Sequence, residues 1–211
     1  MHAVQNRASQ DRAAQEPAAS DRGVGFAQNV EAMTLARAQR GDMQAFATLY
    51  QCFGRPCFNL ALRMLGDRQQ AEDLVQEVFL KMMDTVGSYR GDAPFGAWLK
   101  RLAANACIDQ LRRQRHGVED DPEALFAHLT SDGPEAANMV DAWSLLGRLP
   151  PRARAVLVLH EFEGYTHSEL AALFGQSESY SKSILARAIG RLNALVAASS
   201  LKQVLTCPHE N

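Results

Sequence analysis

Residues that favour β-sheets are scarce in this sequence. Of its 211 residues 7% are aromatic, and β-branched side chains are few, whereas Ala, Leu, Arg and Gln are plentiful. The scarce types favour strands, and the plentiful types favour helices. The composition therefore predicts an all-α protein.

Long hydrophobic runs are absent as well. No apolar run reaches the roughly 18 residues of a membrane-spanning helix, and the N-terminus lacks the charged and then apolar segments of a signal peptide. We therefore expect a cytoplasmic protein with no membrane insertion. The four cysteines fit neither a disulfide framework nor a zinc signature. Cys52 and Cys57 lie in an apolar helical pattern, which predicts small buried side chains.

Signatures of catalysis are missing too. The sequence has no Walker A, Rossmann or G-x-S-x-G motif, and Ser168 has no recognisable base and orienting acid. His160 and His167 flank a turn without further metal ligands at a suitable spacing, and residues 3–115 contain no His. We therefore predict a protein that is not an enzyme and that uses no cofactor and no metal.

A strong excess of positive charge, which marks many nucleic-acid binders, is also lacking. The formal net charge is −2. Any contact with DNA would need cations that are gathered on one part of the chain.

Hydrophobic periodicity divides the chain into five segments. Residues 1–29 are polar and lack a sustained period, which predicts a disordered tail. Residues 30–115 and 136–200 carry helical patterns and predict two helical domains. Between them, residues 116–135 form an acidic linker with a charge of −6, and residues 201–211 form a C-terminal tail.

The first helical domain is expected to be a four-helix bundle. One amphipathic run spans 35–53 and is interrupted at Gly41, with Asp42 placed to cap the helix that follows. Further helices are predicted at 58–65, 69–86 and 95–113, with a loop at 87–94.

The second domain has the outline of a helix-turn-helix. A helix is predicted from Arg152 to Glu161, followed by a turn and a short helix that ends at Gly175. Thr166 and Glu169 have the T-x-x-E spacing of a capping box. A longer helix over 179–196 carries Lys182, Arg187, Arg191 and several serines, and such a polar face is able to reach phosphates and base edges.

Two faces of the first domain stand out by charge. Asp73, Glu77 and neighbouring acids on the third helix surround apolar positions, which fits either a solvated face or a protein-docking face. The fourth helix has a charge of +4 between Trp98 and Arg115, and its start is aromatic. Cations beside aromatic rings are typical of single-stranded DNA binding, although Trp98 also fits a core anchor.

Four strings, in this order, resemble the extracytoplasmic-function (ECF) sigma factors of bacterial RNA polymerase. The first is Ala36–Asp42, together with the residues that follow it as far as Tyr50. The second is Ala71–Phe79, the third is Tyr89–Asn105, and the fourth combines Leu149–Pro150 with Leu170–Phe174. The resemblance covers about residues 32–196. It implies two all-helical domains, called regions 2 and 4, on either side of a flexible linker. It also implies a factor that gives the polymerase its promoter specificity.

The resemblance assigns a role to individual residues. It implies that core RNA polymerase is bound through two of its elements, the coiled coil of its largest subunit and its flap. The face that would dock on the coiled coil is formed by Asp73, Leu74, Gln76, Glu77 and Phe79. Contacts with the minus-ten element are implied for Tyr89, Trp98, Lys100, Arg101, Asn105, Arg112 and Arg113. Contacts with the minus-thirty-five element are implied for Tyr180, Lys182, Ser183 and Arg187. Promoter DNA and an anti-sigma factor are the further partners that the family implies.

The last helix departs from the family pattern. Ile184 and Ile189 stand where arginines are usual, which predicts weaker phosphate anchoring or a different minus-thirty-five sequence. Two alternatives therefore stay open. One is a stand-alone helix-turn-helix regulator whose first domain senses a ligand or dimerises. The other is a polymerase-binding adaptor that no longer reads promoters.

Overall fold

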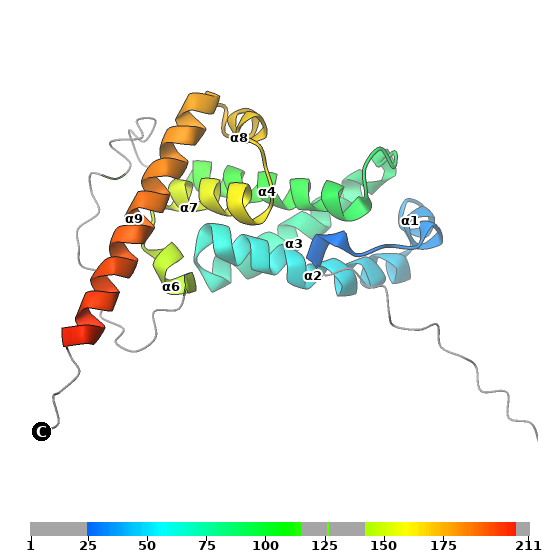
Figure 1. Cartoon of the computed structure of the whole chain (residues 1–211). Coiled ribbons are helices and arrows are strands. Elements are labelled where there is room, and N and C mark those ends of the chain that lie inside the picture. Colours follow the sequence, from blue (N-terminus) through cyan, green and yellow to red (C-terminus); the bar gives the residue numbers. More distant parts are fainter. Residues whose placement is uncertain (1–24, 115–125, 127–141, 206–211) are drawn as a thin grey trace, which may run out of the picture.

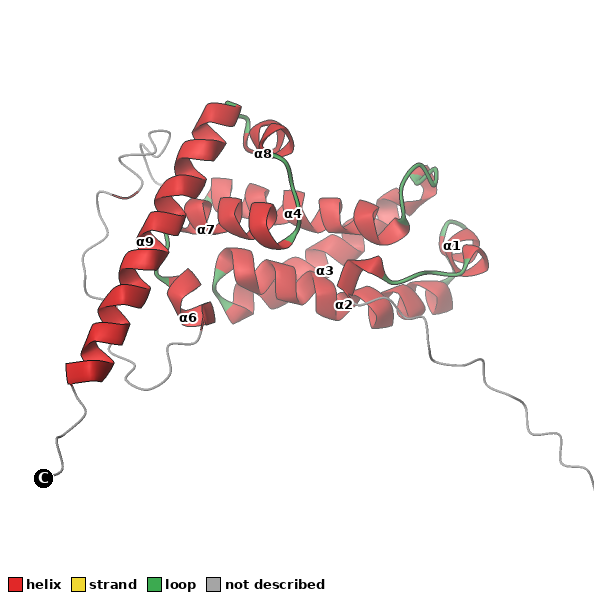
Figure 2. Ribbon diagram, in the orientation of Figure 1, coloured by secondary structure: helices red, strands yellow, loops and turns green. Residues whose placement is uncertain are grey.

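The described part of the chain is built from helices and loops alone. A computed structural model describes residues 25–114, residue 126 and residues 142–205, and none of these lies in a strand (Figure 2). The predicted all-α fold is therefore confirmed. The predicted acidic linker lies outside the described residues except for Phe126, which packs against the core. Within the described ranges, no helix is long and apolar enough to cross a membrane.

The N-terminal unit is a helical bundle that begins at residue 25. Its elements are η1 (Gly25–Ala27), α1 (Ala32–Ala38), α2 (Met43–Leu65), α3 (Arg68–Thr85), η2 (Val86–Ser88) and α4 (Phe95–Arg113). Helices α2, α3 and α4 pack against one another, and α1 packs against α2 (Figure 1). Fully buried side chains such as Leu49, Phe53 and Leu74 fill the space between them.

Local sequence signals set the ends of these helices. The Asp42 carboxylate accepts from the backbone N–H groups of Gln44 and Ala45 and so caps α2, as predicted. A hydrogen bond from Arg37 lowers the pKa of this carboxyl group. Gly66 ends α2 in the left-handed conformation, with φ of 73°. The predicted bounds of α4 are confirmed as well.

Helix α2 is continuous where the sequence predicted two helices. It runs through Pro56, which has no backbone N–H to donate to the carbonyl of Cys52 four residues earlier. The side-chain amide of Gln28 replaces that donor, with 2.8 Å from Nε2 to the Cys52 oxygen. A tertiary hydrogen bond thus compensates the proline, and the helix does not break.

We expect Gln28→Ala to lower the free energy of unfolding by about 1 kcal/mol, because it removes the donor to this carbonyl. In a Pro56→Ala background, the new N–H at residue 56 satisfies the carbonyl from within the helix. The same change at Gln28 should then have a smaller effect. Denaturant unfolding of the four proteins measures the coupling, and equal losses in both backgrounds would contradict the assignment.

The end of the segment predicted as a disordered tail is ordered, because Gly25–Ala27 and Gln28 contact α2 and α4. The ring of Phe26 stacks on Phe53, with 6.4 Å between centroids. The carbonyl oxygen of Phe26 lies so close to Gly96 that a Cβ there would be 1.9 Å away. The absence of a side chain at Gly96 therefore allows the segment around Phe26 to pack against α4, and any larger residue would displace this segment. The sequence does not indicate this contact, because a single aromatic residue in a polar segment carries no periodicity.

The C-terminal unit contains α6 (Ala142–Gly147), α7 (Pro151–Leu157), the π-helical η3 (Val158–Phe162), α8 (His167–Phe174) and α9 (Glu178–Leu205). The predicted capping box is confirmed, since Thr166 and Glu169 bond reciprocally at the start of α8. Gly175 ends α8, also as predicted. The helix predicted to reach Glu161 changes to π geometry at Val158, and α9 extends nine residues past the predicted end at residue 196.

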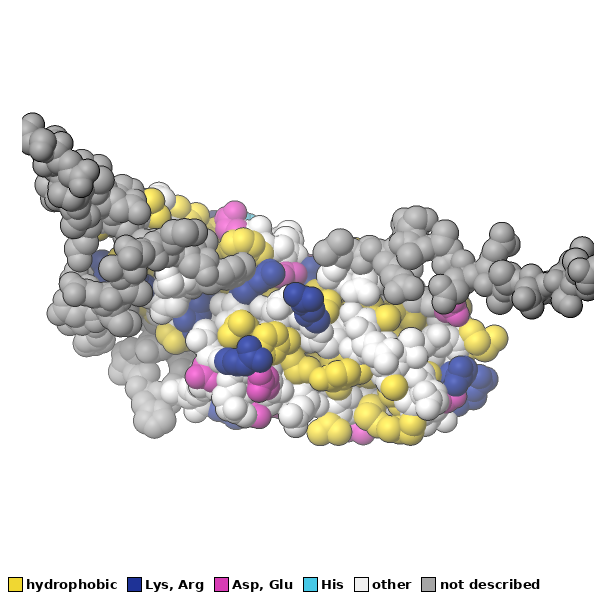
Figure 3. All heavy atoms as spheres, turned by 90° about the horizontal axis from the view of Figure 1, so that it is seen from below, with side chains coloured by type: hydrophobic (Ala, Val, Ile, Leu, Met, Phe, Trp, Pro, Cys, Tyr) yellow, Lys and Arg dark blue, Asp and Glu magenta, His cyan; other side chains and the backbone are white. Residues whose placement is uncertain are grey.

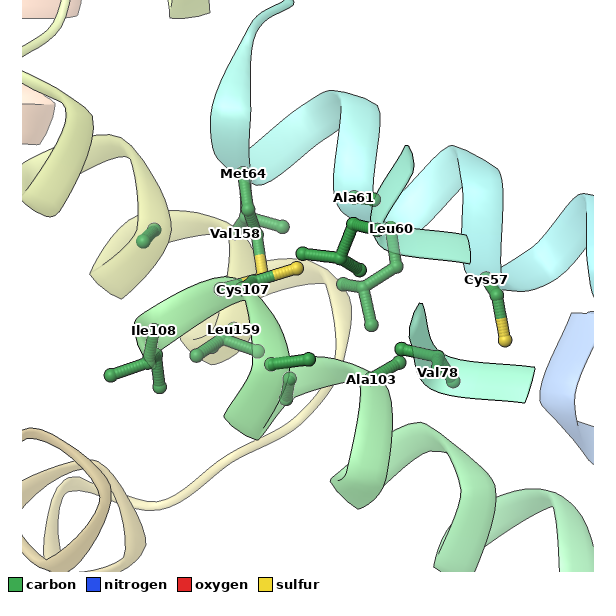
Figure 4. Close-up of a cluster of buried hydrophobic side chains, with 14 of the residues drawn as sticks. Cys57, Leu60, Ala61, Met64, Val78, Ala103, Cys107, Ile108, Val158 and Leu159 are labelled. Atoms are coloured by element: carbon green, nitrogen blue, oxygen red, sulfur yellow. The ribbon is translucent and has the colours of Figure 1, made fainter. Parts of the chain in front are cut away.

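The two units pack directly against each other. Helix α7 contacts α2 and α4, and α8 contacts α4 (Figure 1). Buried residues of both units belong to one hydrophobic cluster. Figure 4 shows Met64 and Cys107 of the N-terminal unit in one cluster with Val158 and Leu159 of the C-terminal unit. No pattern in the sequence indicates this interface.

Candidate functional site

The acidic face predicted on α3 is open to solvent. Asp73, Gln76 and Glu77 are exposed, whereas Leu74 and Phe79 are 1% and 7% exposed and support the helix from the core. Glu77 lies 3.5 Å from Arg113, and Asp73 accepts from Gln69 at 3.3 Å; both contacts are solvent-exposed. Exposed pairs of this kind contribute little stability. The carboxylates are thus accessible to a partner.

Exposed apolar side chains continue this face, and sequence analysis missed them. Leu80 is 64% exposed and Met83 36%, and both follow Glu77 within two turns of α3. Tyr50 of α2 is 51% exposed and meets Phe79 edge-on at 4.8 Å. From below the molecule, hydrophobic patches are exposed among charged side chains (Figure 3). The sequence could have indicated the exposure of Leu80, because this residue falls outside the helical period of the buried positions of α3.

An aromatic cluster holds the loop before α4 in place. The rings of Tyr89, Phe95 and Trp98 lie 5.4–5.6 Å apart. The Tyr89 hydroxyl donates to the Ala93 carbonyl at 2.7 Å, which ties the loop to itself. Trp98 is half-buried, so one part of its ring packs against the core and another part is accessible.

Four predicted DNA-contacting residues form a line along α4. Trp98, Arg101, Asn105 and Arg112 recur at intervals of three, four and seven residues, which places them on one side of a helix. Asn105 is half-buried. Within the described residues, its side-chain amide has no hydrogen-bond partner. The amide is therefore free to donate to and accept from a ligand.

Two cations of α4 contact the C-terminal unit. Lys100 donates to the carbonyl of Glu163 at 2.8 Å, and Arg112 donates to the carbonyl of Leu173 at 2.6 Å. The Lys100 ammonium also lies 5.5 Å from the ring centroid of Tyr165. Burial raises the pKa of Tyr165 to about 12, so its hydroxyl is neutral at physiological pH. These α4 donors therefore face the second unit in this arrangement.

The polar face of α9 includes most of the predicted contacts. Lys182 and Arg187 are exposed, and Ser183 is half-buried. Lys182 lies 3.7 Å from Glu178 in an exposed pair. Tyr180, however, is 8% exposed, with its ring centroid 5.0 Å from the Arg152 guanidinium. The phase of α9 turns this ring toward Arg152 of α7, so Tyr180 is not on the exposed face, and its DNA contact stays a prediction.

The two isoleucines of α9 have different environments. Ile184 is fully buried in the core, and Ile189 is 39% exposed. The side chain of Ile184 therefore contributes to packing in the core, and the predicted effect on the minus-thirty-five element stays a prediction. Only at Ile189 does an apolar residue occupy a position that a cation could use.

A histidine pair joins the helices of the C-terminal unit. The rings of His160 and His167 stack with 4.4 Å between centroids. His160 donates to the Tyr165 carbonyl at 2.7 Å, and His167 Nδ1 lies 2.9 Å from the Ser181 hydroxyl of α9. Burial, with a smaller contribution from His160, lowers the pKa of His167. The sequence offered no metal-binding role for these residues, and the contact of His167 with Ser181 connects α8 to α9.

Comparison with known proteins matches both units. The family model of Sigma-70 region 2 matches residues 49–117, and that of Sigma-70, region 4 matches residues 140–192. The RNA polymerase sigma-H factor of Pseudomonas aeruginosa is 32% identical over 160 residues, which are 69% of this chain and 83% of that protein. The ECF RNA polymerase sigma factor SigM of Mycobacterium tuberculosis is 31% identical over 176 residues, 82% of this chain and 89% of that protein.

Among solved structures, CnrH in complex with the cytosolic domain of CnrY is similar to this chain. The identity is 28% and the TM-score 0.48, with 79% of this chain and 96% of that chain covered.

Two helical units with an acidic helix face and a cationic helix, together with the matched family models and the likeness to sigma-H and SigM, define an RNA polymerase sigma factor. The chain belongs to the ECF group of the sigma-70 family. Such a protein is a transcription initiation factor and not an enzyme, and it binds core RNA polymerase and promoter DNA.

Proposed function

We propose that the exposed face of α3 binds the coiled coil of the largest polymerase subunit. Asp73, Gln76 and Glu77 would supply the polar contacts, and Leu80 and Met83 the apolar ones. Leu74 and Phe79 hold the face from the core, since both are buried. An exposed patch with apolar residues inside a polar rim is typical of a protein-binding surface. The C-terminal unit would bind the polymerase flap.

The second element of the proposal is that α4 and the loop before it read the nontemplate strand of the minus-ten element. Rings at Tyr89 and Trp98 would stack on unpaired bases, and Asn105 would bond to one base edge. The phosphates would be bound by the cations of α4, which are Lys100, Arg101, Arg112 and Arg113. Stacking and phosphate contacts together favour a single strand over a duplex, so that binding also promotes melting.

The third element is that α9 enters the major groove at the minus-thirty-five element. Lys182, Ser183 and Arg187 would contact phosphates and bases, while Ile189 leaves one position without a cation. An anti-sigma factor would act on the same two units. The cytoplasm, where polymerase and promoter DNA meet, would be the location of the protein.

The single observation that supports this function best is the separation of charge within one bundle. Asp73 and Glu77 of α3 and Arg101, Arg112 and Arg113 of α4 are exposed on neighbouring helices of a protein with a net charge of −2. A stand-alone regulator has no need of the α3 face and binds duplex DNA alone. We expect promoter DNA to be bound tightly only when core polymerase is present. Tight, sequence-specific binding by the isolated chain would favour the regulator instead.

A further inference from the structure

The loop before α4, residues 87–94, has a composition that favours mobility. Residues 90–94 are all exposed, and glycines stand at positions 87 and 91, with φ of 82° at Gly91. Ordering such a segment on a ligand costs conformational entropy, and glycine loses the most. A loop that is already held in its binding conformation loses less of this entropy when it binds. The contacts that hold residues 87–94 in the free protein therefore bear on how readily they capture a base.

The residue after α1 holds the start of this loop. The side-chain amide of Gln39 donates to the backbone carbonyl of Tyr89 at 2.9 Å and to that of Val86 at 3.3 Å. Gln39 and Tyr89 are 50 positions apart in the sequence, but α1 and the loop lie at the same end of the bundle (Figure 1). Leu35 packs α1 against the core. The two hydrogen bonds thus fix the backbone at Tyr89, whose ring the proposed function places on a base.

The segment before α1 supports the same loop through a chain of aromatic rings. Phe26 stacks on Phe53 with 6.4 Å between centroids, and Phe53 lies 5.6 Å from Phe95. Phe95 in turn contacts Tyr89 and Trp98, each at 5.4 Å. Phe53 is fully buried and Phe95 is 5% exposed, so neither ring has room to shift independently. A displacement at Phe26 would therefore reach the two rings that the proposed function places on bases.

Backbone contacts seat this segment against the first turn of α4. A Cβ at Gly96 would lie 1.9 Å from the carbonyl oxygen of Phe26 and 3.1 Å from the Phe53 ring. Gln28 donates to the carbonyls of Gly25 and Cys52, at 2.9 and 2.8 Å, and so ties the segment to itself and to α2. The segment is thus fixed beside the residues that begin the DNA-reading helix.

We propose that residues 25–39 form a brace for the loop at 87–94, and that Phe26 and Gln39 are positioning residues for promoter melting. Neither residue is assigned a contact with DNA, and each acts through the rings of Tyr89 and Trp98. The brace keeps these rings ready to receive an unpaired base, so that less entropy is lost when the base leaves the stack. This inference rests on the proposed function, because it takes the loop and α4 as the surface that reads the minus-ten element.

Run-off transcription with core polymerase from two templates tests the brace. One template is a duplex promoter that the chain selects from genomic fragments. The other has the same sequence with mismatches that leave its minus-ten element unpaired. We expect Gln39→Ala and Phe26→Ala each to lower transcription from the duplex about fivefold, the effect of one lost hydrogen bond or ring contact. Transcription from the unpaired template should stay within about twofold of the wild type, because no base has to leave a stack.

Gly96→Ala perturbs the brace by adding atoms instead of removing them. It leaves Phe26 and Gln39 in place but displaces the Phe26 carbonyl, so it should cause the same selective loss on the duplex. Gln44→Ala is the matched control for Gln39→Ala, because Gln44 is exposed and, among the described residues, only its backbone forms hydrogen bonds. Asp67→Ala removes the cap of α3 and so lowers stability without touching the loop. Both controls should keep the wild-type ratio of transcription from the two templates.

Hydrogen–deuterium exchange measures the brace in the free full-length protein, without DNA or polymerase. Backbone amides of the loop should exchange about fivefold faster in Gln39→Ala and Phe26→Ala, because exchange follows the population of locally opened states. Amides of the loop should exchange as in the wild type in Gln44→Ala and Asp67→Ala.

Three results would overturn the proposal. Equal losses on both templates would show that Phe26 and Gln39 only stabilise the fold. Unchanged exchange in the loop would show that they do not hold it. Faster exchange with wild-type transcription from the duplex would show that the order of the loop does not limit melting. Trp98→Ala separates these outcomes from a failure of the proposed function. If it lowers transcription from the duplex and the Phe26 and Gln39 variants do not, the brace alone is wrong, whereas no effect of Trp98→Ala would contradict the proposed function and the brace together.

Discussion

Reversal of charge at Asp73 and Glu77 should abolish binding to core polymerase. Both side chains are exposed on α3, and neither caps a helix, since Asp67 has that role. The double change Asp73→Lys and Glu77→Lys replaces two proposed attractive contacts with two repulsive ones. Truncating or reversing central charged contacts of an interface typically weakens binding by several kcal/mol. A pull-down with purified core polymerase measures the loss.

The matched control changes the same amount of charge elsewhere. Glu31→Lys with Glu161→Lys alters two exposed acids that lie outside α3. This control should bind core polymerase like the wild type. Thermal unfolding of both double variants should stay close to the wild type, because surface substitutions usually shift stability by less than about 0.5 kcal/mol. Wild-type affinity in the Asp73 and Glu77 variant would exclude the docking assignment.

Replacement of Asn105 by alanine should remove discrimination at one minus-ten position. The amide has no partner within the described residues and lies on the same side of α4 as Trp98 and Arg101. A base-edge contact of this kind contributes about 1–3 kcal/mol of discrimination, which corresponds to roughly 5- to 150-fold. Transcription from templates that carry each of the four bases at every minus-ten position measures the effect.

Arg101→Ala is the comparison that separates base reading from phosphate binding. Arg101 is exposed on the same line of α4. A phosphate contact carries no sequence information, so its loss should weaken all templates alike and reduce the dependence of binding on salt. If Asn105→Ala also scales every template by one factor, its assignment to a base is wrong.

Features set by neighbouring residues were the ones that the sequence predicted. The cap at Asp42, the capping box of Thr166 and Glu169 and the bounds of α4 depend on contacts within a few residues. The exposed positions of Asp73 and Glu77 followed from helical periodicity alone.

Features set by distant residues escaped prediction. Helix α2 passes through Pro56 because Gln28 supplies the missing donor from 24 residues away. Tyr180 and Ile184 are buried because α9 turns them toward the core, and the sequence pattern of a recognition helix does not fix that rotation. The hydrogen bond from Arg154 of α7 to the carbonyl of Met64 joins residues 90 positions apart. Contacts of this kind depend on how whole helices pack, and no local pattern encodes them.

The most direct test of the central claim is run-off transcription with purified core polymerase on a library of genomic fragments. With the chain added, we expect transcripts to start at a limited set of sites that share a minus-ten and a minus-thirty-five sequence. Core polymerase alone, or with the Asp73 and Glu77 double variant, should not start at those sites. The same start sites with and without the chain would contradict its role as a promoter-specificity factor.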